Sequence, residues 1–263
     1  MSENKEEKDI INNLELNEIK TKNQNNIKLK IIDKLESKYC HHSKTVNLFI
    51  IFNSINNILC LIYPNERYSI ISYDLINNKK MLEIKNAHDA FISTFRHIVD
   101  KENKRDLIVS ISDENNSFKL WNINKAECLY YIKNIYDKYN LFLACFLKDN
   151  NKIYVITSNS VDIQPFKIFN LDGKFIKEIN NYNEYVAFID IYYDNKLSKI
   201  YIITGNFHNI QSIDYYENKL YHEYEKGRGY LFLNIIIKIG KEIVKLIDSS
   251  SDGYIHVWNF YAA

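Results

Sequence analysis

From residue 27 onward the chain alternates apolar and polar residues in short runs of strand length. The first run, Ile27-Lys28-Leu29-Lys30-Ile31, has the two-residue period of a half-buried strand. The later runs fall into five units of one kind, the first four with four predicted strands and the last with three. We predict these strands at residues 45–52, 58–63, 68–75 and 81–84; 91–98, 106–112, 117–123 and 127–132; 141–147, 152–157, 165–171 and 174–179; 185–193, 199–204, 210–215 and 219–224; and 230–238, 242–248 and 254–260.

The third strand of every unit ends in a large apolar residue, then Asn or Asp, then another apolar residue. The first residues of these motifs lie 48, 48, 44 and 45 positions apart. Repetition at this period, with strand-like flanks, predicts an all-β propeller of about five four-stranded antiparallel blades. The motifs are Tyr73-Asp74-Leu75, Trp121-Asn122-Ile123, Phe169-Asn170-Leu171, Ile213-Asp214-Tyr215 and Trp258-Asn259-Phe260.

Residues 1–26 differ from the propeller domain expected at 27–263, since they are polar and end in Asn23-Gln24-Asn25-Asn26. Two interpretations remain open: a frayed, disordered tail, or a short amphipathic docking helix formed by Ile10, Ile11, Leu14, Leu16 and Ile19. The fifth unit lacks a fourth strand, and a predicted strand at 27–33 has no partner. Pairing the two would close a five-bladed ring and remove both open edges. The other possibility is that the chain is part of a longer ring.

Two of the units resemble WD40 repeats. The better match is the segment from Leu246 to Asn259, with Ser-Ser-Asp-Gly before a strand that ends in Trp258-Asn259. The second unit follows the same pattern with Ala87-His88-Asp89, Ser112-Asp113 and Phe118-Lys119-Leu120-Trp121-Asn122. The other units match only in strand rhythm and in the motif at their end. The resemblance covers roughly residues 27–260 and implies a divergent WD40-type propeller, a fold that usually serves as a binding platform.

The resemblance also implies a hydrogen-bonded chain of His, Ser or Thr, Asp and Trp inside a blade. In the second unit its members would be His88, Ser110 or Ser112, Asp113 and Trp121, although Asp113 lies eight residues before Trp121 instead of the family's six. In the fifth unit they would be Asp252 and Trp258, without a His before the first strand. Because a buried indole N–H needs an acceptor, we assign all of these residues a structural role.

Composition narrows the choice of partners. The net charge is +1, from 34 basic and 33 acidic residues, so no electrostatic footprint for nucleic acid or an anionic membrane is present. Gly and Pro are scarce, with six and two residues, and Asn-rich clusters take the turn positions.

The cysteines Cys40, Cys60, Cys128 and Cys145 have no metal-binding spacing, which favours free thiols in a reducing compartment. Without an apolar leader or membrane-spanning run, we expect a cytosolic or nuclear location, with cytoplasmic favoured.

No catalytic constellation emerges from the sequence. Cys40-His41-His42 is a poor zinc site because adjacent ligands do not easily reach one ion. Asp190 is an isolated acid on a predicted inner strand, and glycoside chemistry needs a pair of acids.

We therefore expect no enzyme activity and no cofactor, but a scaffold that binds a protein or peptide on one face of the propeller. Two alternatives remain: part of a larger WD40 regulatory protein, and a five-bladed enzyme acting on a small molecule. The predicted partner contacts are Phe91, Arg96, Arg228 and Ser251.

Overall fold

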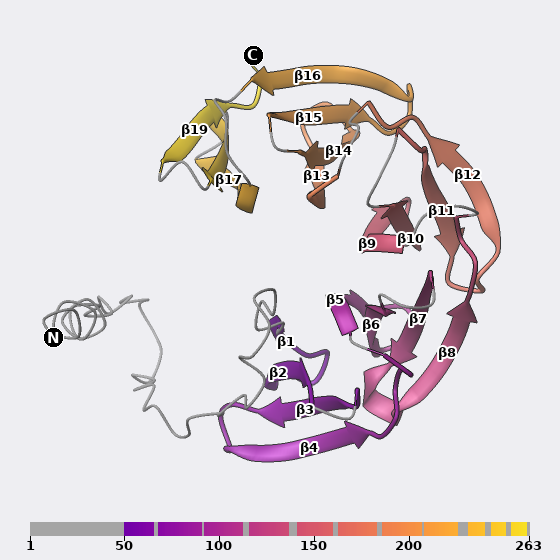
Figure 1. Ribbon diagram of the computed structural model, residues 1–263. Coiled ribbons are helices and arrows are strands. Elements are labelled where there is room, and N and C mark those ends of the chain that lie inside the picture. Colours follow the sequence, from indigo (N-terminus) through magenta and orange to yellow (C-terminus); the bar gives the residue numbers. More distant parts are fainter. Residues whose placement is uncertain are drawn as a thin grey trace, which may run out of the picture. The chain divides into compact units, whose positions relative to one another are not determined.

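The computed structural model describes residues 50–261 except for residues 66–67, 91, 113–115, 137–140, 160–162, 183–185, 207, 226–230, 240–242 and 251–253. Within these residues the fold is all-β, and the only helical element is the 3-10 turn η1 (Ile123–Lys125) (Figure 1). The predicted tail at 1–26 and the predicted strand at 27–33 lie outside the described residues.

The strands form five antiparallel sheets in chain order, as the sequence predicts. Sheet 1 has β1 (Ile50–Asn53), β2 (Leu59–Pro64), β3 (Ile70–Asp74) and β4 (Lys79–Ile84). Sheet 2 has β5 (Ile92–Asp100), β6 (Arg105–Ser112), β7 (Ser117–Asn122) and β8 (Glu127–Ile132). Sheet 3 has β9 (Leu141–Asp149), β10 (Lys152–Asn159), β11 (Phe166–Asn170) and β12 (Phe175–Ile179). Sheet 4 has β13 (Phe188–Asp194), β14 (Lys199–Gly205), β15 (Asn209–Asp214) and β16 (Lys219–Glu225). Sheet 5 has β17 (Leu231–Ile239), β18 (Ile243–Ser250) and β19 (Ile255–Asn259).

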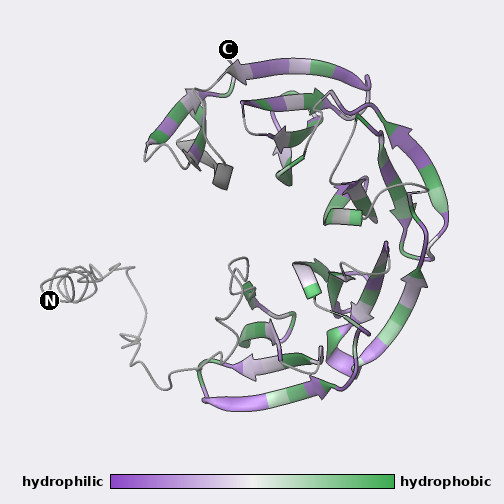
Figure 2. Ribbon diagram, in the orientation of Figure 1, coloured by the Kyte–Doolittle hydropathy of each residue, from purple (hydrophilic) through white to green (hydrophobic). Residues whose placement is uncertain are grey.

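Every sheet is a meander in which each strand pairs with the next, so we number the strands of a sheet first to fourth. The described part of sheet 5 holds only a first, a second and a third strand. Figure 2 shows apolar and polar segments alternating along the strands. The second strands of sheets 2, 3 and 4 are buried along almost their whole length, whereas the fourth strands β4 and β8 are exposed or half-buried, so burial depends on a strand's place in its sheet.

The Asn and Asp residues of the repeated motif form the turns after the third strands. Asp74 Oδ1 accepts hydrogen bonds from the backbone N–H groups of Ile76 and Asn77, both at 2.9 Å. Asp214 Oδ1 accepts the equivalent pair from Tyr216 and Glu217, again at 2.9 Å. These Asx turns explain the motif, because a short acceptor side chain at this point fixes the reversal into the fourth strand. Several other turns use Asn at positive φ in place of Gly, as expected: Asn57, Asn78, Asn86, Asn116, Asn134, Asn150, Asn151 and Asn218.

Consecutive sheets pack against each other through their first strands, which contact in the series β1, β5, β9, β13 and β17. The apolar core is divided in the same way. One cluster joins residues of sheets 2 and 3, such as Leu107 and Phe169, and another joins sheets 3 and 4, such as Ile168 and Ile202. Two further clusters join sheets 1 and 2 and sheets 4 and 5. Each interface is thus a nearest-neighbour interface of the kind found in repeat proteins.

Candidate functional site

The first polar network lies in sheet 2 and the loop before it, and it contains three of the predicted candidates, His88, Ser110 and Trp121. The Trp121 indole N–H donates to Ser110 Oγ at 2.8 Å, and Ser110 Oγ lies 2.7 Å from His88 Nε2. All three residues are buried. Ser110, on β6, is therefore the serine that joins His88 to Trp121. The hydroxyl of Ser112 is buried without a hydrogen-bond partner among the described residues, and Asp113 lies outside them.

Burial lowers the pKa of His88 to about 4, and the nearby Lys119 ammonium adds to this effect. The imidazole is therefore neutral at neutral pH. With Nε2 as the acceptor, the Ser110 hydroxyl uses its proton towards His88 and a lone pair towards Trp121. The structural role expected of His88 stays a prediction, which its buried position favours.

The position of Ser110 carries a polar group in sheet 3 as well. On β6, Ser110 lies two residues after Ile108, which pairs with Trp121. On β10, Thr157 lies two residues after Val155, which pairs with Phe169, so Ser110 and Thr157 occupy equivalent positions. Tyr136 takes the place of His88: its hydroxyl lies 2.8 Å from Thr157 O and 3.3 Å from Thr157 Oγ1. The WD40 pattern does not reveal this pair in the sequence, because Tyr136 stands where the pattern has His and Phe169 stands where it has Trp.

In sheet 5 the same position is Asp248, two residues beyond Leu246, the partner of Trp258. The Trp258 indole N–H donates to Asp248 Oδ2 at 2.6 Å, and His256 Nδ1 lies 2.9 Å from Asp248 Oδ1. Trp258 thus has its acceptor on the neighbouring strand. Asp252, the predicted member of this network, lies outside the described residues.

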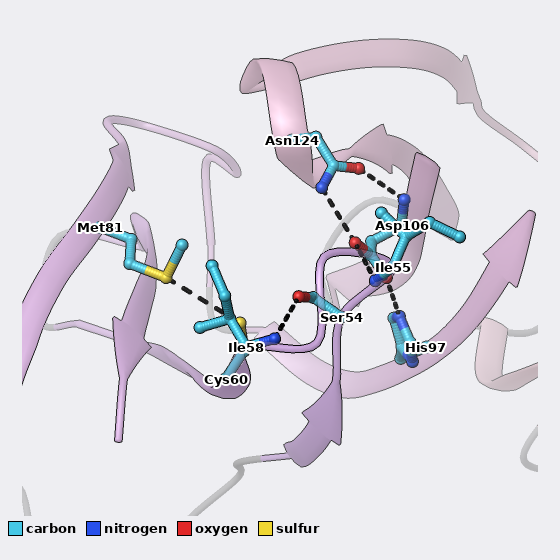
Figure 3. A network of polar contacts seen from close by, with 8 residues as sticks. All are labelled: Ser54, Ile55, Ile58, Cys60, Met81, His97, Asp106 and Asn124. Carbon is cyan, nitrogen blue, oxygen red and sulfur yellow. Dashed lines mark hydrogen bonds and ion pairs between the residues drawn. The ribbon is translucent and has the colours of Figure 1, made fainter. Parts of the chain in front are cut away.

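A second polar network connects sheets 1 and 2 (Figure 3). Its centre is the fully buried Asp106 at the start of β6. The Ile55 N–H, in the turn after β1, lies 3.0 Å from both carboxylate oxygens, and His97 Nε2 lies 2.9 Å from Oδ1. Asn124 donates its side-chain amide to Oδ2 at 2.9 Å and accepts the Asp106 N–H.

Burial by itself would raise the pKa of Asp106, but the hydrogen bonds from His97, Asn124 and the Ile55 N–H outweigh it and hold the pKa below its usual value. The carboxylate therefore stays ionised and acts as an acceptor for two sheets at once. Since every group around it is a donor, we assign this network to structure. Nothing in the sequence marks this network, because its members come from four separate elements, the turn after β1, β5, β6 and η1.

The first strands of sheets 2, 3 and 4 place Arg96, Cys145 and Asp190 at the same level. They lie opposite Val109, Ile156 and Ile203 on the second strands. Each of these three residues directly follows the one that pairs with the first residue of the repeated motif. Partial desolvation raises the pKa of the exposed Asp190 carboxyl, while the Ile191 N–H and the Arg96 guanidinium oppose this shift. Arg96, a predicted partner contact, also donates to Phe95 O at 2.9 Å.

An exposed apolar patch lies where sheets 3 and 4 meet. We define the Tyr193–Tyr216 patch as the exposed side chains of Tyr193 and Tyr216, at 39% and 49%, together with Leu197 of the turn between β13 and β14, at 49%. The Tyr193 hydroxyl accepts the Lys148 N–H at 2.7 Å, and the Tyr216 hydroxyl donates to Asp149 Oδ1 at 2.7 Å. Neighbouring residues of sheet 3 therefore hold both rings of sheet 4.

The turns that carry the patch are also tied together. Lys199 Nζ lies 2.7 Å from Asp214 Oδ2 and 2.9 Å from Glu217 Oε1, which joins the turn that contains Leu197 to the turn that contains Tyr216. Partial desolvation and the hydrogen bond to Asp149 raise the pKa of Tyr216 to about 12, so its hydroxyl remains a donor. The patch is thus apolar, exposed and fixed in place.

Other predicted residues lie outside the described part: Phe91, Arg228, Ser251, and the Cys40-His41-His42 segment. Among the residues that are described, no group of three or more His, Cys, Asp or Glu side chains is placed to hold a metal ion. Nor does any helix in that part of the chain have the length and apolar character that crossing a bilayer requires.

No protein-family model matches the chain. No curated protein matches it either. Function must therefore be argued from the sheets and their exposed groups.

Proposed function

We propose that the chain is a non-enzymatic protein-interaction scaffold, a five-bladed propeller of the WD40-repeat type that binds a protein or peptide partner on a face of its blades. Three features support the propeller. The five sheets are equivalent meanders, their first strands contact in series, and Trp121 and Trp258 donate to the same position of the second strand. Stacked sheets with this arrangement are typical of propeller blades.

The Tyr193–Tyr216 patch is the observation that carries the binding proposal. Aromatic side chains provide large contact areas and lose little conformational entropy on binding, particularly when their orientation is already fixed. Here both hydroxyls are bound by sheet 3, while the rings remain open to solvent together with Leu197. Such a surface suits an extended peptide segment whose apolar side chain packs between the two rings.

Charge around the patch is mixed, since Lys199 is paired with Asp214 and Glu217. Apolar contact with the rings would therefore supply most of the affinity, and the binding would depend weakly on salt. This agrees with the near-neutral net charge of the whole chain, +1.

The test is affinity capture from the native lysate with three forms of the full chain. The first is the wild type, and the second carries Tyr193→Ser and Tyr216→Ser. The third is a control that carries Ile76→Ser and Ile163→Ser, at two apolar residues elsewhere that are more exposed, at 61% and 57%. We expect a set of proteins that the wild type and the control retain and the patch variant loses. Equal retention by all three forms, or no retained protein at all, would contradict the proposal.

A further inference from the structure

Two lysines adjoin Tyr193 and Leu197 of the Tyr193–Tyr216 patch. The backbone N–H of Lys148, near the end of β9, donates to the Tyr193 hydroxyl at 2.7 Å. The exposed Lys196 directly precedes Leu197 in the turn between β13 and β14. A lysine side chain is long and flexible, so both ammonium groups can reach a ligand that covers the patch.

Two further lysines adjoin Tyr216. Its hydroxyl donates to Asp149, and the exposed Lys152 is the strand partner of Asp149 in the hairpin of β9 and β10. Its N–H donates to Asp214, and the exposed Lys219 is the strand partner of Asp214 in the hairpin of β15 and β16. The turns that carry or hold the patch therefore bring four lysines to its border. We name them the border lysines: Lys148, Lys152, Lys196 and Lys219.

The ammonium groups of the border lysines have no ion-pair partner among the residues that the structure describes. The carboxylates on the same turns, by contrast, already accept a hydrogen bond or form an ion pair: Asp149, Asp194, Asp214 and Glu217. A ligand at the patch thus finds ammonium groups without partners and carboxylates that already have one.

The turns of sheet 2 are arranged differently. There the exposed Lys101 directly precedes the exposed Glu102, and the exposed Lys125 lies two residues before the exposed Glu127. A ligand on sheet 2 would meet both signs of charge at one point. At the patch the exposed carboxylate, Glu217, is already held in an ion pair. The border of the patch is therefore selective for the sign of the charge that it receives.

We propose that the partner of the Tyr193–Tyr216 patch is an acidic peptide segment, in which an apolar side chain packs between the two rings and flanking Asp or Glu residues pair with the border lysines. This inference rests on the proposed function and narrows it to one class of partner. Residues 148–152, 194–199 and 214–219 contain five lysines and four carboxylates, so their field at a distance is weak and the rings still supply most of the affinity. Contact between charges selects the partner, because a basic segment would bring like charges to the border.

The mixture of charges also favours a peptide over a nucleic acid. Aromatic rings beside lysines occur in proteins that bind single strands, where a continuous basic groove follows the phosphates. Here Asp149 and Glu217 stand among the border lysines and repel a chain that carries a phosphate at every nucleotide. A peptide can place a few carboxylates at the lysines alone.

Selection from a phage-displayed library of random linear peptides on the immobilised full chain tests the proposal. The selected peptides are synthesised, and fluorescence polarisation measures their affinity for the wild type and for the variant with Tyr193→Ser and Tyr216→Ser. We expect peptides that need both tyrosines and carry Asp or Glu beside an apolar residue. Replacing these acids with Lys should weaken binding to the wild type about tenfold.

Charge reversal on the protein gives a second, independent measurement. The test variant replaces three exposed border lysines: Lys152→Glu, Lys196→Glu and Lys219→Glu. The matched control makes the same change of charge at three exposed lysines of sheets 1 and 2: Lys79→Glu, Lys101→Glu and Lys125→Glu. We expect the test variant to bind the selected peptides about tenfold more weakly and to prefer their Lys-substituted forms, whereas the control binds like the wild type. Melting temperatures establish that both variants are folded.

The possible failures are distinguishable. Peptides that need both tyrosines but carry no acidic residue, or that bind the folded test variant as tightly as the wild type, would overturn the acidic partner and leave the proposed function standing. A selection without any peptide that needs the tyrosines would overturn both. Tyrosine-dependent binding of a single-stranded uridine oligonucleotide, in competition with the selected peptides, would assign the surface to nucleic acid and also overturn the proposal.

Discussion

Trp258 donates its indole N–H to the carboxylate of Asp248 at 2.6 Å, at the strand position where Ser110 receives Trp121 in sheet 2. The two sheets thus satisfy an indole N–H with different chemistry, a carboxylate for the half-buried Trp258 and a hydroxyl for the buried Trp121. The equivalence rests on strand register, since each acceptor lies two residues beyond the partner of its tryptophan.

Replacing Asp248 with Ala should destabilise sheet 5. The substitution removes the carboxylate that accepts from the Trp258 N–H and contacts the His256 ring, and since both side chains are half-buried we expect a loss of about 1 kcal/mol, the lower end of the cost of an orphaned group. Urea denaturation followed by tryptophan fluorescence measures the loss. Asp248→Asn keeps an oxygen acceptor and should lose less. Equal stability of the Ala variant and the wild type would show that the bond to Trp258 contributes nothing.

His88 should make the fold sensitive to mild acid. Its folded-state pKa is lowered to about 4 from 6.5, mainly by burial, so the folded chain binds fewer protons than the unfolded chain between these values. The contribution is fully present above pH 6.5 and is lost as the pH falls towards 4. Melting temperatures across this range should therefore fall less steeply for His88→Gln. Parallel curves for the two proteins would refute the assignment.

Removing the carboxylate of Asp106 should loosen the contact between sheets 1 and 2. Asp106→Ala strips the acceptor from the Ile55 N–H and from Asn124, with an expected cost of about 2–4 kcal/mol for a buried, charge-assisted network. Hydrogen exchange at the Ile55 amide should become faster, and Asp106→Asn should keep part of its protection. An unchanged exchange rate at Ile55 in the Ala variant would be inconsistent with this bond.

The turn between β11 and β12 requires glycine at position 173. Gly173 has φ +71°, and a Cβ atom there would overlap the ring of Tyr130 on β8 of the neighbouring sheet. Gly173→Ala should cost about 1–2 kcal/mol from the backbone conformation alone, plus the displacement of the ring. Calorimetry of the single variants and of the combination with Tyr130→Ala separates the two parts. If Tyr130→Ala does not reduce the cost, the overlap with the ring has no effect.

The strand pattern was readable from the sequence because it is local. Alternation with a period of two places a strand whatever its neighbours are, and an Asn or Asp after an apolar residue forms its own turn, as Asp74 and Asp214 do. The all-β fold and the five antiparallel sheets were predicted correctly for this reason. The sequence did not predict which of Ser110 and Ser112 would bond to His88 and Trp121. Residues two apart lie on the same face of a strand and differ only in their position along it.

The hydrogen-bond networks that join separate segments could not be predicted from local sequence either. Asp106 gathers donors from the turn after β1, from β5 and from η1, and nothing in those stretches of sequence marks them as neighbours. The Tyr193–Tyr216 patch depends on which tyrosines the packing of sheets 3 and 4 leaves in solvent.

By itself, the sequence determined the strands, their turns and the repeat, because alternation and Asx turns act over a few residues. Tertiary structure decided which polar groups meet, which tyrosines stay exposed and which edge is left uncovered. Those outcomes depend on the register between strands and on the contact between sheets. Ile255 illustrates the difference: its strand resembles the other third strands in sequence, and only the lack of a fourth strand beside it in the described structure leaves it 72% exposed.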